Sequence, residues 1–161
     1  MPYAIGFYRK AHGTYPAESV EEALRHKANG LRAMKLKIGF GLEEDLALIR
    51  AVREAIGPET RLMADANGAY NTALARRLLL EASEYKLYFL EELLAPEDIE
   101  GYLAIRHLSE TYVASGENLF VKIGYRHWIA QGALDILQPD LCSSGGFTEC
   151  KKIASLAHRS T

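Results

Sequence analysis

The chain has 161 residues, 48% of them hydrophobic and 25% charged, which is typical of one soluble globular domain. Its formal net charge is −2 with both signs interspersed, so nothing indicates a nucleic-acid-binding or membrane-binding surface. No apolar run approaches the roughly 20 residues of a membrane span, and the first ten residues lack the layout of a signal peptide.

Short apolar runs alternate with amphipathic helical patterns along the chain. The runs that predict strands are Tyr3–Tyr8, Ala33–Ile38, Arg61–Ala64, Tyr88–Leu90, Tyr112–Ser115 and Leu134–Leu137. The first helix is predicted to open at Ser19, with Glu22 in capping-box spacing. The later helical patterns are Leu42–Ile56, Thr72–Glu84, Ile99–Glu110, Tyr125–Gln131 and Thr148–Ala157. This alternation predicts a parallel sheet covered by helices, either an open doubly wound sheet or a (β/α) barrel.

Charged residues recur where the later predicted strands end, at intervals of 23 to 28 residues. They are Lys37, Asp65, Glu91, Glu117 and Asp140. Because the interval equals one strand–helix unit, each step returns a charged group to the same edge of the sheet. An open sheet would spread these groups along a line, whereas a barrel converges them where active sites are built. Convergence favours an α/β fold of the TIM-type (β/α) barrel, incomplete, with about six units and parallel strands.

Three of these residues are candidate metal ligands. Asp65, Glu91 and Glu117 would repel one another at one edge, and a divalent cation removes that penalty. Oxygen ligands without neighbouring Cys or His favour Mg²⁺, with Mn²⁺ second. Asn67 has the same strand-face parity as Asp65 and is a candidate to orient a ligand or contact substrate. Taken alone, Asp65 and Asn67 are also consistent with an ordinary turn.

Two lysines precede the acidic residues by one unit. Lys35 and Lys37 share one face of their strand, and the alternative is an edge strand with a solvated polar face. We expect the adjacent ammonium groups to depress each other's pKa, which makes Lys37 a candidate base and leaves Lys35 to hold developing negative charge. Tyr8 and Arg9, at the end of the first strand, are candidates for contact with a substrate's distal polar groups, against the alternative of a solvated strand end.

Five segments in order carry a resemblance to a known family. They are MKLKIG, ADANGAY, FLEELLAPEDIEGY, ASGENLF and LQPDLCSSGG. With them the chain resembles the enolase superfamily, in particular the mandelate racemase subgroup of the mandelate racemase/muconate lactonizing enzyme family. The resemblance implies a (β/α) barrel, Mg²⁺, and abstraction of the proton α to the carboxylate of a small-molecule substrate. Known outcomes are dehydration, racemisation and epimerisation of hydroxy acids and acid sugars.

The resemblance also implies residue roles. Asp65, Glu91 and Glu117 are then metal ligands and Lys37 is a base. The metal and the Lys35 ammonium would stabilise the enediolate intermediate. Asp140 would orient a histidine base on the opposite face of the substrate.

The chain departs from the family pattern in three places. Leu93 stands where the family commonly has proline, which should shift a loop without removing a ligand. Adding one unit of 23 to 28 residues to Asp140 places the partner histidine at 163 to 168, beyond Thr161, so His158 is expected to be a helix-end histidine instead. The chain also starts almost at the first strand, where the family has a capping domain.

We therefore expect residues 1–161 to be a partial barrel domain without the N-terminal capping domain and the last strands. A partial barrel exposes parallel strand edges, which predicts a homo-oligomer or marginal stability. Low or absent turnover of this chain by itself is also expected. The alternatives are a non-catalytic remnant or scaffold, and a barrel aldolase in which Lys35 or Lys37 forms a Schiff base.

Cellular location and partners follow from composition. Cys142 and Cys150 lack the spacing of a zinc site, so we expect free thiols in a reducing cytoplasm. The expected partner is a small-molecule carboxylate substrate, with no nucleic-acid or membrane partner.

Overall fold

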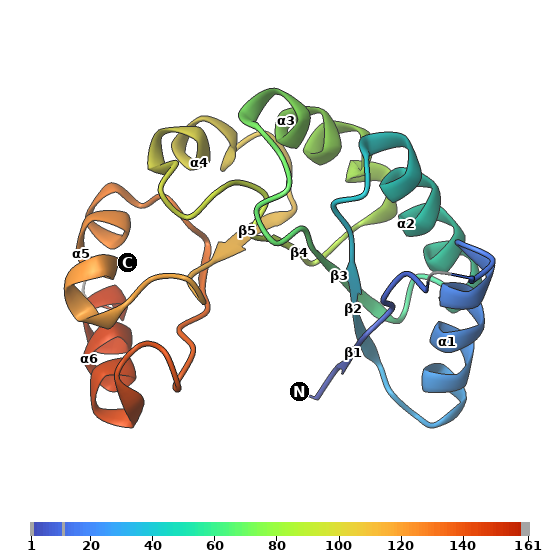
Figure 1. Ribbon diagram of the computed structural model, residues 1–161, viewed down its shortest axis with the longest axis horizontal. Coiled ribbons are helices and arrows are strands. Elements are labelled where there is room, and N and C mark those ends of the chain that lie inside the picture. The colour runs from blue at the N-terminus through green and yellow to red at the C-terminus, as the bar shows by residue number, and fades with distance from the viewer. Residues whose placement is uncertain (1, 11, 159–161) are drawn as a thin grey trace.

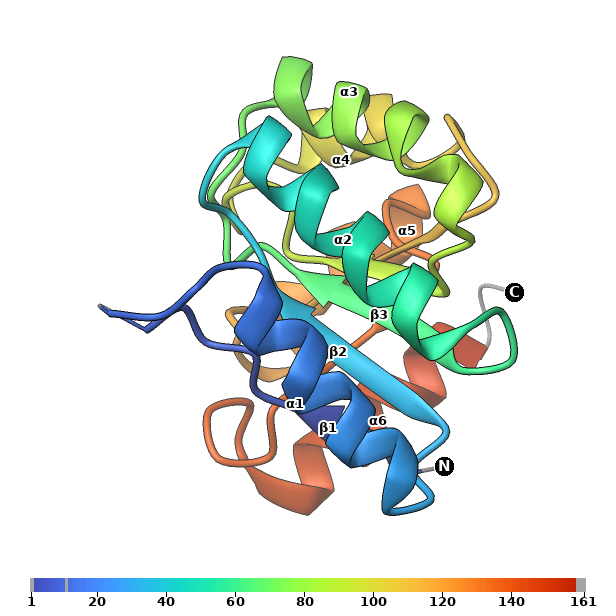
Figure 2. The same ribbon diagram turned by 90° about the vertical axis from the view of Figure 1, so that its right-hand side faces the viewer.

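The computed structural model describes residues 2–10 and 12–158. In this part of the chain, six parallel strands form one sheet in the sequential order β1-β2-β3-β4-β5-β6. The sheet curves into an arc, and the helices lie along its outer side (Figures 1 and 2). This arrangement confirms the predicted α/β fold of an incomplete TIM-type barrel with parallel strands. Within the described residues, no helix is long and apolar enough to cross a membrane.

The elements alternate along the chain as the sequence predicts. The strands are β1 (Ala4–Ile5), β2 (Ala33–Lys37), β3 (Arg61–Asp65), β4 (Phe89–Glu91), β5 (Tyr112–Ser115) and β6 (Ile136–Leu137). The α-helices are α1 (Ala17–Ala28), α2 (Leu42–Ile56), α3 (Thr72–Glu81), α4 (Ile99–Ile105), α5 (Val121–Gln131) and α6 (Gly146–His158), and a 3₁₀ turn, η1, covers Ser83–Tyr85.

Several predicted boundaries are wrong for local reasons. Helix α1 begins at Ala17 after Pro16, and Ser19 is buried inside the helix rather than capping it. The first strand ends at Ile5, because Gly6 and Phe7 have positive φ angles of 145° and 60° that turn the chain. Helices α3 and α4 end earlier than predicted, and α5 and α6 begin earlier. Helix ends are the least determined part of a hydrophobic pattern.

The alternation of side chains across the strands separates two apolar layers. Leu36, Leu62 and Leu90 are fully buried in the main core, which also contains residues of the surrounding helices. The opposite face carries a smaller cluster of Ala33, Met63, Phe89 and Ala114. Because side chains alternate with a period of two, residues at the parity of this smaller cluster point to the concave side of the arc. Those positions carry the candidate site.

Strand register brings the ends of neighbouring strands together. Lys37 pairs with Asp65 in register, and Asp65 in turn pairs with Glu91. These residues share the parity of the concave cluster, so their side chains converge on the concave side at the carboxyl ends of β2, β3 and β4. The predicted return of a charged group to one edge of the sheet is therefore confirmed for these three strands.

Candidate active site

A buried ion-pair cluster occupies the carboxyl ends of β2, β3 and β4. Lys35 Nζ lies 2.5 Å from Glu91 Oε2 and 3.4 Å from Asp65 Oδ2. The side chains of Lys35, Asp65 and Glu91 are only 10%, 1% and 3% exposed. Charges this deeply buried are tolerated only when they are paired and hydrogen-bonded. Removing any one of these three side chains would therefore leave a buried charge without its full set of partners.

The cluster extends outward from Lys35 through a second lysine. Lys37 Nζ lies 2.6 Å from Asp65 Oδ2 and 2.8 Å from Asn67 Oδ1. The Asn67 side-chain amide donates to Glu117 Oε1 at 3.4 Å. Asn67 has a positive φ of 45°, and its backbone N–H donates to Asp65 Oδ1. The turn considered for Asp65 and Asn67 is thus present, and it also places the Asn67 amide beside Lys37 and Glu117.

The lysines and carboxylates pair with each other in the structure. Lys35 lies between Asp65 and Glu91, and Glu117 joins the cluster through Asn67. Among the described residues, no group of three His, Cys, Asp or Glu side chains is placed to hold a metal ion. The donor chemistry nevertheless fits a hard dication: every candidate ligand atom is an oxygen, and three carboxylates face only two ammonium groups.

The pKa of Lys35 differs from the expectation that adjacent ammonium groups depress each other. Burial alone lowers this pKa, but the hydrogen bond to Glu91 and the charges of Glu91 and Asp65 outweigh burial and raise it. The expectation was wrong for Lys35 because it counted the neighbouring lysine and left out the carboxylates that lie closer.

Glu92 is a buried acid that the sequence reasoning did not assign to the site. Its side chain accepts a hydrogen bond from Asn118 Nδ2 at 2.8 Å. The pKa of Glu92 is raised to about 7, chiefly by burial and in addition by the charges of Glu117 and Asp65, against the opposing effect of the Asn118 hydrogen bond. A φ of 45° at Glu92 takes the backbone out of the extended conformation, and Glu92 interacts electrostatically with Glu117 and Asp65. Regular strand alternation would have sent Glu91 and Glu92 to opposite faces.

Gln138 was also missed. Its Nε2 donates to Glu91 Oε2 at 3.0 Å, and its backbone N–H donates to Ser115 O at 3.0 Å. The second bond continues the β5–β6 ladder one residue beyond β6. Strand alternation places Gln138 on the concave face, which would have indicated it. The prediction did not include it because only charged residues at strand ends were considered.

Three predicted site residues lie outside the cluster. Asp140 is exposed in the turn after β6, where the backbone N–H groups of Ser143 and Cys142 donate to its carboxylate and lower its pKa. Arg9 pairs with Glu44 at 2.6 Å, against the start of α2. Tyr8 is 63% exposed. Because β1 is so short, Tyr8 and Arg9 follow the end of the strand by three and four residues, rather than closing it as predicted. His158 is the last residue of α6, as expected.

A buried carboxylate holds together the loop that follows Lys37 and the loop that carries Asn67. Asp45, in the first turn of α2, accepts the Gly39 N–H at 2.7 Å and the Tyr70 hydroxyl. A Cβ added at Gly39 would lie 2.9 Å from the Ala66 carbonyl oxygen, so glycine is required where the loops approach. The short loop after β2 and the loop after β3 are therefore fixed against each other.

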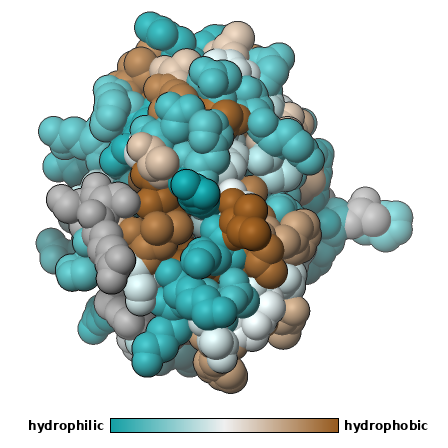
Figure 3. Space-filling view, turned by 90° about the vertical axis from the view of Figure 1, so that its left-hand side faces the viewer, coloured by the Kyte–Doolittle hydropathy of each residue, from teal (hydrophilic) through white to brown (hydrophobic). Residues whose placement is uncertain are grey.

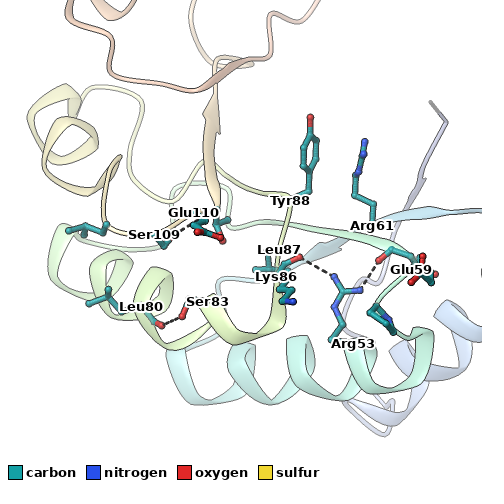
Figure 4. A pocket seen from close by; sticks show the side chains of 14 residues that line it. Arg53, Glu59, Arg61, Leu80, Ser83, Lys86, Leu87, Tyr88, Ser109 and Glu110 are labelled. Carbon is teal, nitrogen blue, oxygen red and sulfur yellow. Dashed lines mark hydrogen bonds between the residues drawn. The ribbon is translucent and has the colours of Figure 1, made fainter.

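A cavity of about 710 Å³ lies at the other end of the strands, near the residues that begin β3, β4 and β5. Arg53 reaches into this region and donates to the carbonyl oxygens of Thr60 and Lys86 at 2.7 Å and 3.2 Å (Figure 4). It also donates to the carbonyl oxygen of Tyr85 at 2.8 Å. The arginine thus ties loops together. None of the lysines and carboxylates of the cluster lines this cavity.

Comparison with known proteins places these observations in context. Residues 18–160 match the family model described as enolase C-terminal domain-like. The chain is 43% identical over 155 residues to a D-galactarolactone cycloisomerase of Agrobacterium fabrum, covering 96% of this chain and 41% of that protein.

Solved structures agree with this result. The crystal structure of the 3,6-anhydro-D-galactonate cycloisomerase from Zobellia galactanivorans superposes with a TM-score of 0.92 at 41% identity, over 99% of this chain and 44% of that one. The L-talarate dehydratase from Polaromonas sp. JS666, complexed with Mg and L-glucarate, has a TM-score of 0.88 at 30% identity, over 97% of this chain and 44% of that one. The chain thus spans about two fifths of the length of these relatives.

Proposed function

The chain belongs to the enolase C-terminal domain-like family, and we propose that the residues of its ion-pair cluster take part in abstraction of the proton α to the carboxylate of a substrate. Its relatives are enolase-superfamily dehydratases, cycloisomerases and racemases. The proposed substrate is a hydroxy acid or acid sugar, which undergoes dehydration, racemisation or epimerisation. The contact chain that joins Glu91, Lys35, Asp65 and Lys37 across three adjacent strands carries this proposal.

The proposed metal is Mg²⁺, with Mn²⁺ as the second choice. Asp65, Glu91 and Glu117 would hold it, since their oxygens extend from consecutive strand ends and outnumber the local ammonium groups. When bound, the cation would neutralise the substrate carboxylate and the charge that develops on it. A relative complexed with Mg and L-glucarate supports both the metal and a small-molecule carboxylate partner.

The chain's own groups have separate proposed roles. Lys37 takes the α-proton on its Nζ, and Asp65 and Asn67 hold that atom in place. Lys35 donates to the negative charge that develops on the substrate. Asn67, Tyr8 and Arg9 are proposed substrate contacts. Asp140 is proposed to orient a base on the opposite face of the substrate.

We also propose that residues 1–161 are a partial barrel domain, with the capping domain and last barrel strands outside it. The fraction of its relatives that the chain spans supports this division. Low turnover by the chain alone is a consequence, because other parts of the protein would then complete the site. A cytoplasmic location is proposed from the free thiols of Cys142 and Cys150.

A titration with Mg²⁺ tests the metal site. Isothermal calorimetry compares the chain with a variant carrying both Asp65→Asn and Glu117→Gln. We expect the double variant to bind Mg²⁺ more weakly by over 100-fold, which exceeds the about 10–100-fold cost of losing a group that only orients a ligand.

The control variant removes the same number of negative charges, but from exposed positions. Glu43 and Glu97 are exposed, so the paired variant Glu43→Gln and Glu97→Gln should bind Mg²⁺ as the unmodified chain does. Equal and negligible binding in all three proteins would remove the metal site from the proposal.

The Schiff-base alternative finds less support in the contacts. A Schiff-base lysine needs a neutral amine. Lys35 Nζ lies 2.5 Å from Glu91 Oε2, and the raised pKa of Lys35 favours its protonated form. Trapping of a carbonyl substrate with borohydride would be the result that restores this alternative.

Self-association is proposed from the two ends of the sheet. Within the described residues, β1 and β6 each have one strand neighbour, so each leaves a parallel edge. Ile5 on β1 is 60% exposed. At the other end of the arc, α5 and α6 expose Ile123 at 78% and Phe147 at 81%, and hydrophobic side chains are visible on that face (Figure 3). These apolar edges favour contact with another copy of the chain.

We expect the chain to elute as a dimer or larger species in size-exclusion chromatography with light scattering. Ile5→Lys should shift it toward monomer, because a charged side chain at a strand edge opposes pairing. Leu24→Lys, at an exposed position on α1, should leave the elution volume unchanged. A monomer that unfolds cooperatively at high temperature would contradict the proposal.

A further inference from the structure

We propose that Gln138 is a positioning residue that orients the Glu91 carboxylate toward a bound divalent cation. The inference rests on the proposed function, since it requires Glu91 to be a metal ligand. It adds a neutral residue to a site otherwise defined by charged side chains.

The curvature of the sheet makes the contact. Glu91 ends β4, Lys35 lies on β2, and Gln138 follows β6, so the two donors are each two strands away from Glu91. Both donate to the same oxygen, Oε2, at 2.5 Å from Lys35 Nζ and 3.0 Å from Gln138 Nε2. Two donors that approach one oxygen from opposite sides fix the plane of the carboxylate. The proposal assigns the other oxygen, Oε1, to the cation.

Backbone contacts fix the position from which the Gln138 side chain extends. The Gln138 N–H donates to Ser115 O, which extends the β5–β6 ladder through Gln138. A Cβ added at Gly116 would lie 3.1 Å from the Gln138 backbone nitrogen, so the chains approach closely here. Gln138 therefore projects from an ordered ladder position rather than from a free loop.

The environment of the Gln138 side-chain oxygen, Oε1, does not favour a purely structural role for this residue. Gln138 Oε1 is buried and has no hydrogen-bond partner among the described residues. A buried acceptor without a partner costs about 1–3 kcal/mol, which an apolar side chain at this position would avoid. The contact that accounts for an amide here is its donation to Glu91.

Mg²⁺ affinity of Gln138 variants tests the inference. Gln138→Met removes the donor while keeping a long side chain, and Gln138→Glu keeps the shape but replaces the donor by a carboxylate. We expect Mg²⁺ to bind about 10–100-fold more weakly to Gln138→Met, as when other groups that orient metal ligands are lost. Gln138→Glu should also bind more weakly, because a carboxylate cannot donate to Glu91. If charge alone mattered, the added negative charge would tighten binding instead.

The matched control is Gln131→Met, which removes an exposed amide on α5. It should bind Mg²⁺ as the unmodified chain does. Gln138→Asn, whose shorter amide does not reach Glu91, provides a second variant if Gln138→Met fails to fold. Circular dichroism verifies folding of each protein before calorimetry.

The outcomes separate this inference from the proposed function. An unmodified chain that binds no Mg²⁺ overturns both. Binding to the unmodified chain that is unchanged in the folded Gln138 variants, or tightened by Gln138→Glu, overturns only the role of Gln138.

Discussion

Lys35→Met is expected to lower the free energy of unfolding of the metal-free chain by about 3–5 kcal/mol, the usual cost of breaking a buried ion pair from one side. Lys35 Nζ is shared by Glu91 and Asp65, whose side chains are at most 3% exposed. Methionine fills a similar volume, so the variant loses the charge more than the packing. The buried carboxylates of Asp65 and Glu91 would then lack the positive charge of Lys35. Urea unfolding followed by circular dichroism measures the change.

Lys37→Met is the matched control for this loss of stability. The Lys37 side chain is 19% exposed and sits at the rim of the cluster, so water can replace part of its interaction. Its effect should be clearly smaller than that of Lys35→Met. Adding Mg²⁺ at about 100 times its dissociation constant should stabilise each metal-binding protein by about 2.7 kcal/mol. Equal losses in the two lysine variants would contradict the assignment of Lys35 as the central cation of the cluster.

Lys37→Met is expected to slow exchange of the substrate α-proton by about 10²–10⁴-fold, the range that a positioned base contributes. The variant keeps Asp65 and Asn67 but removes the nitrogen that both of them hold. The measurement is proton NMR of a hexose-derived sugar acid in D₂O, with Mg²⁺ and a high concentration of protein. Exchange is a suitable signal because it requires proton transfer without completion of the overall reaction.

Lys10→Met provides the control, since the Lys10 side chain is 64% exposed and belongs to a different segment. It should exchange the α-proton at the rate of the unmodified chain. Exchange by Lys37→Met at that same rate would contradict the role of Lys37 as the base. No exchange by the unmodified chain would instead favour the non-catalytic remnant.

The order of elements follows from local patterns in the sequence. Apolar runs of strand length alternate with helical periodicity, and this alone predicts parallel strands with helices between them. The spacing of Lys37, Asp65 and Glu91 by one unit predicts that they return to one edge. Strand register confirms this expectation, because the register pairs Lys37 with Asp65 and Asp65 with Glu91. These periodic patterns can be recognised in the sequence because the periods of helices and strands depend only on residues close together in the chain.

The boundaries that failed depend on single backbone conformations. Positive φ angles at Gly6 and Phe7 end β1 early and leave Tyr8 and Arg9 beyond the strand. A positive φ at Glu92 ends the strand alternation after Glu91, and Glu92 is buried as Glu91 is. Strand alternation assumes an extended backbone, so it cannot anticipate a residue that leaves that conformation.

Local patterns in the chain were enough to predict the alternating fold, the family and the set of charged residues that end the strands. Which side chains make contact became known only from the folded chain: Lys35 bridges Glu91 and Asp65, Gln138 reaches Glu91 from β6, and Asp140 stays in an exposed turn. The contacts were not predictable because they span the sheet. Contacts between residues on strands two positions apart arise from curvature, and curvature is a property of all six strands together rather than of any local segment.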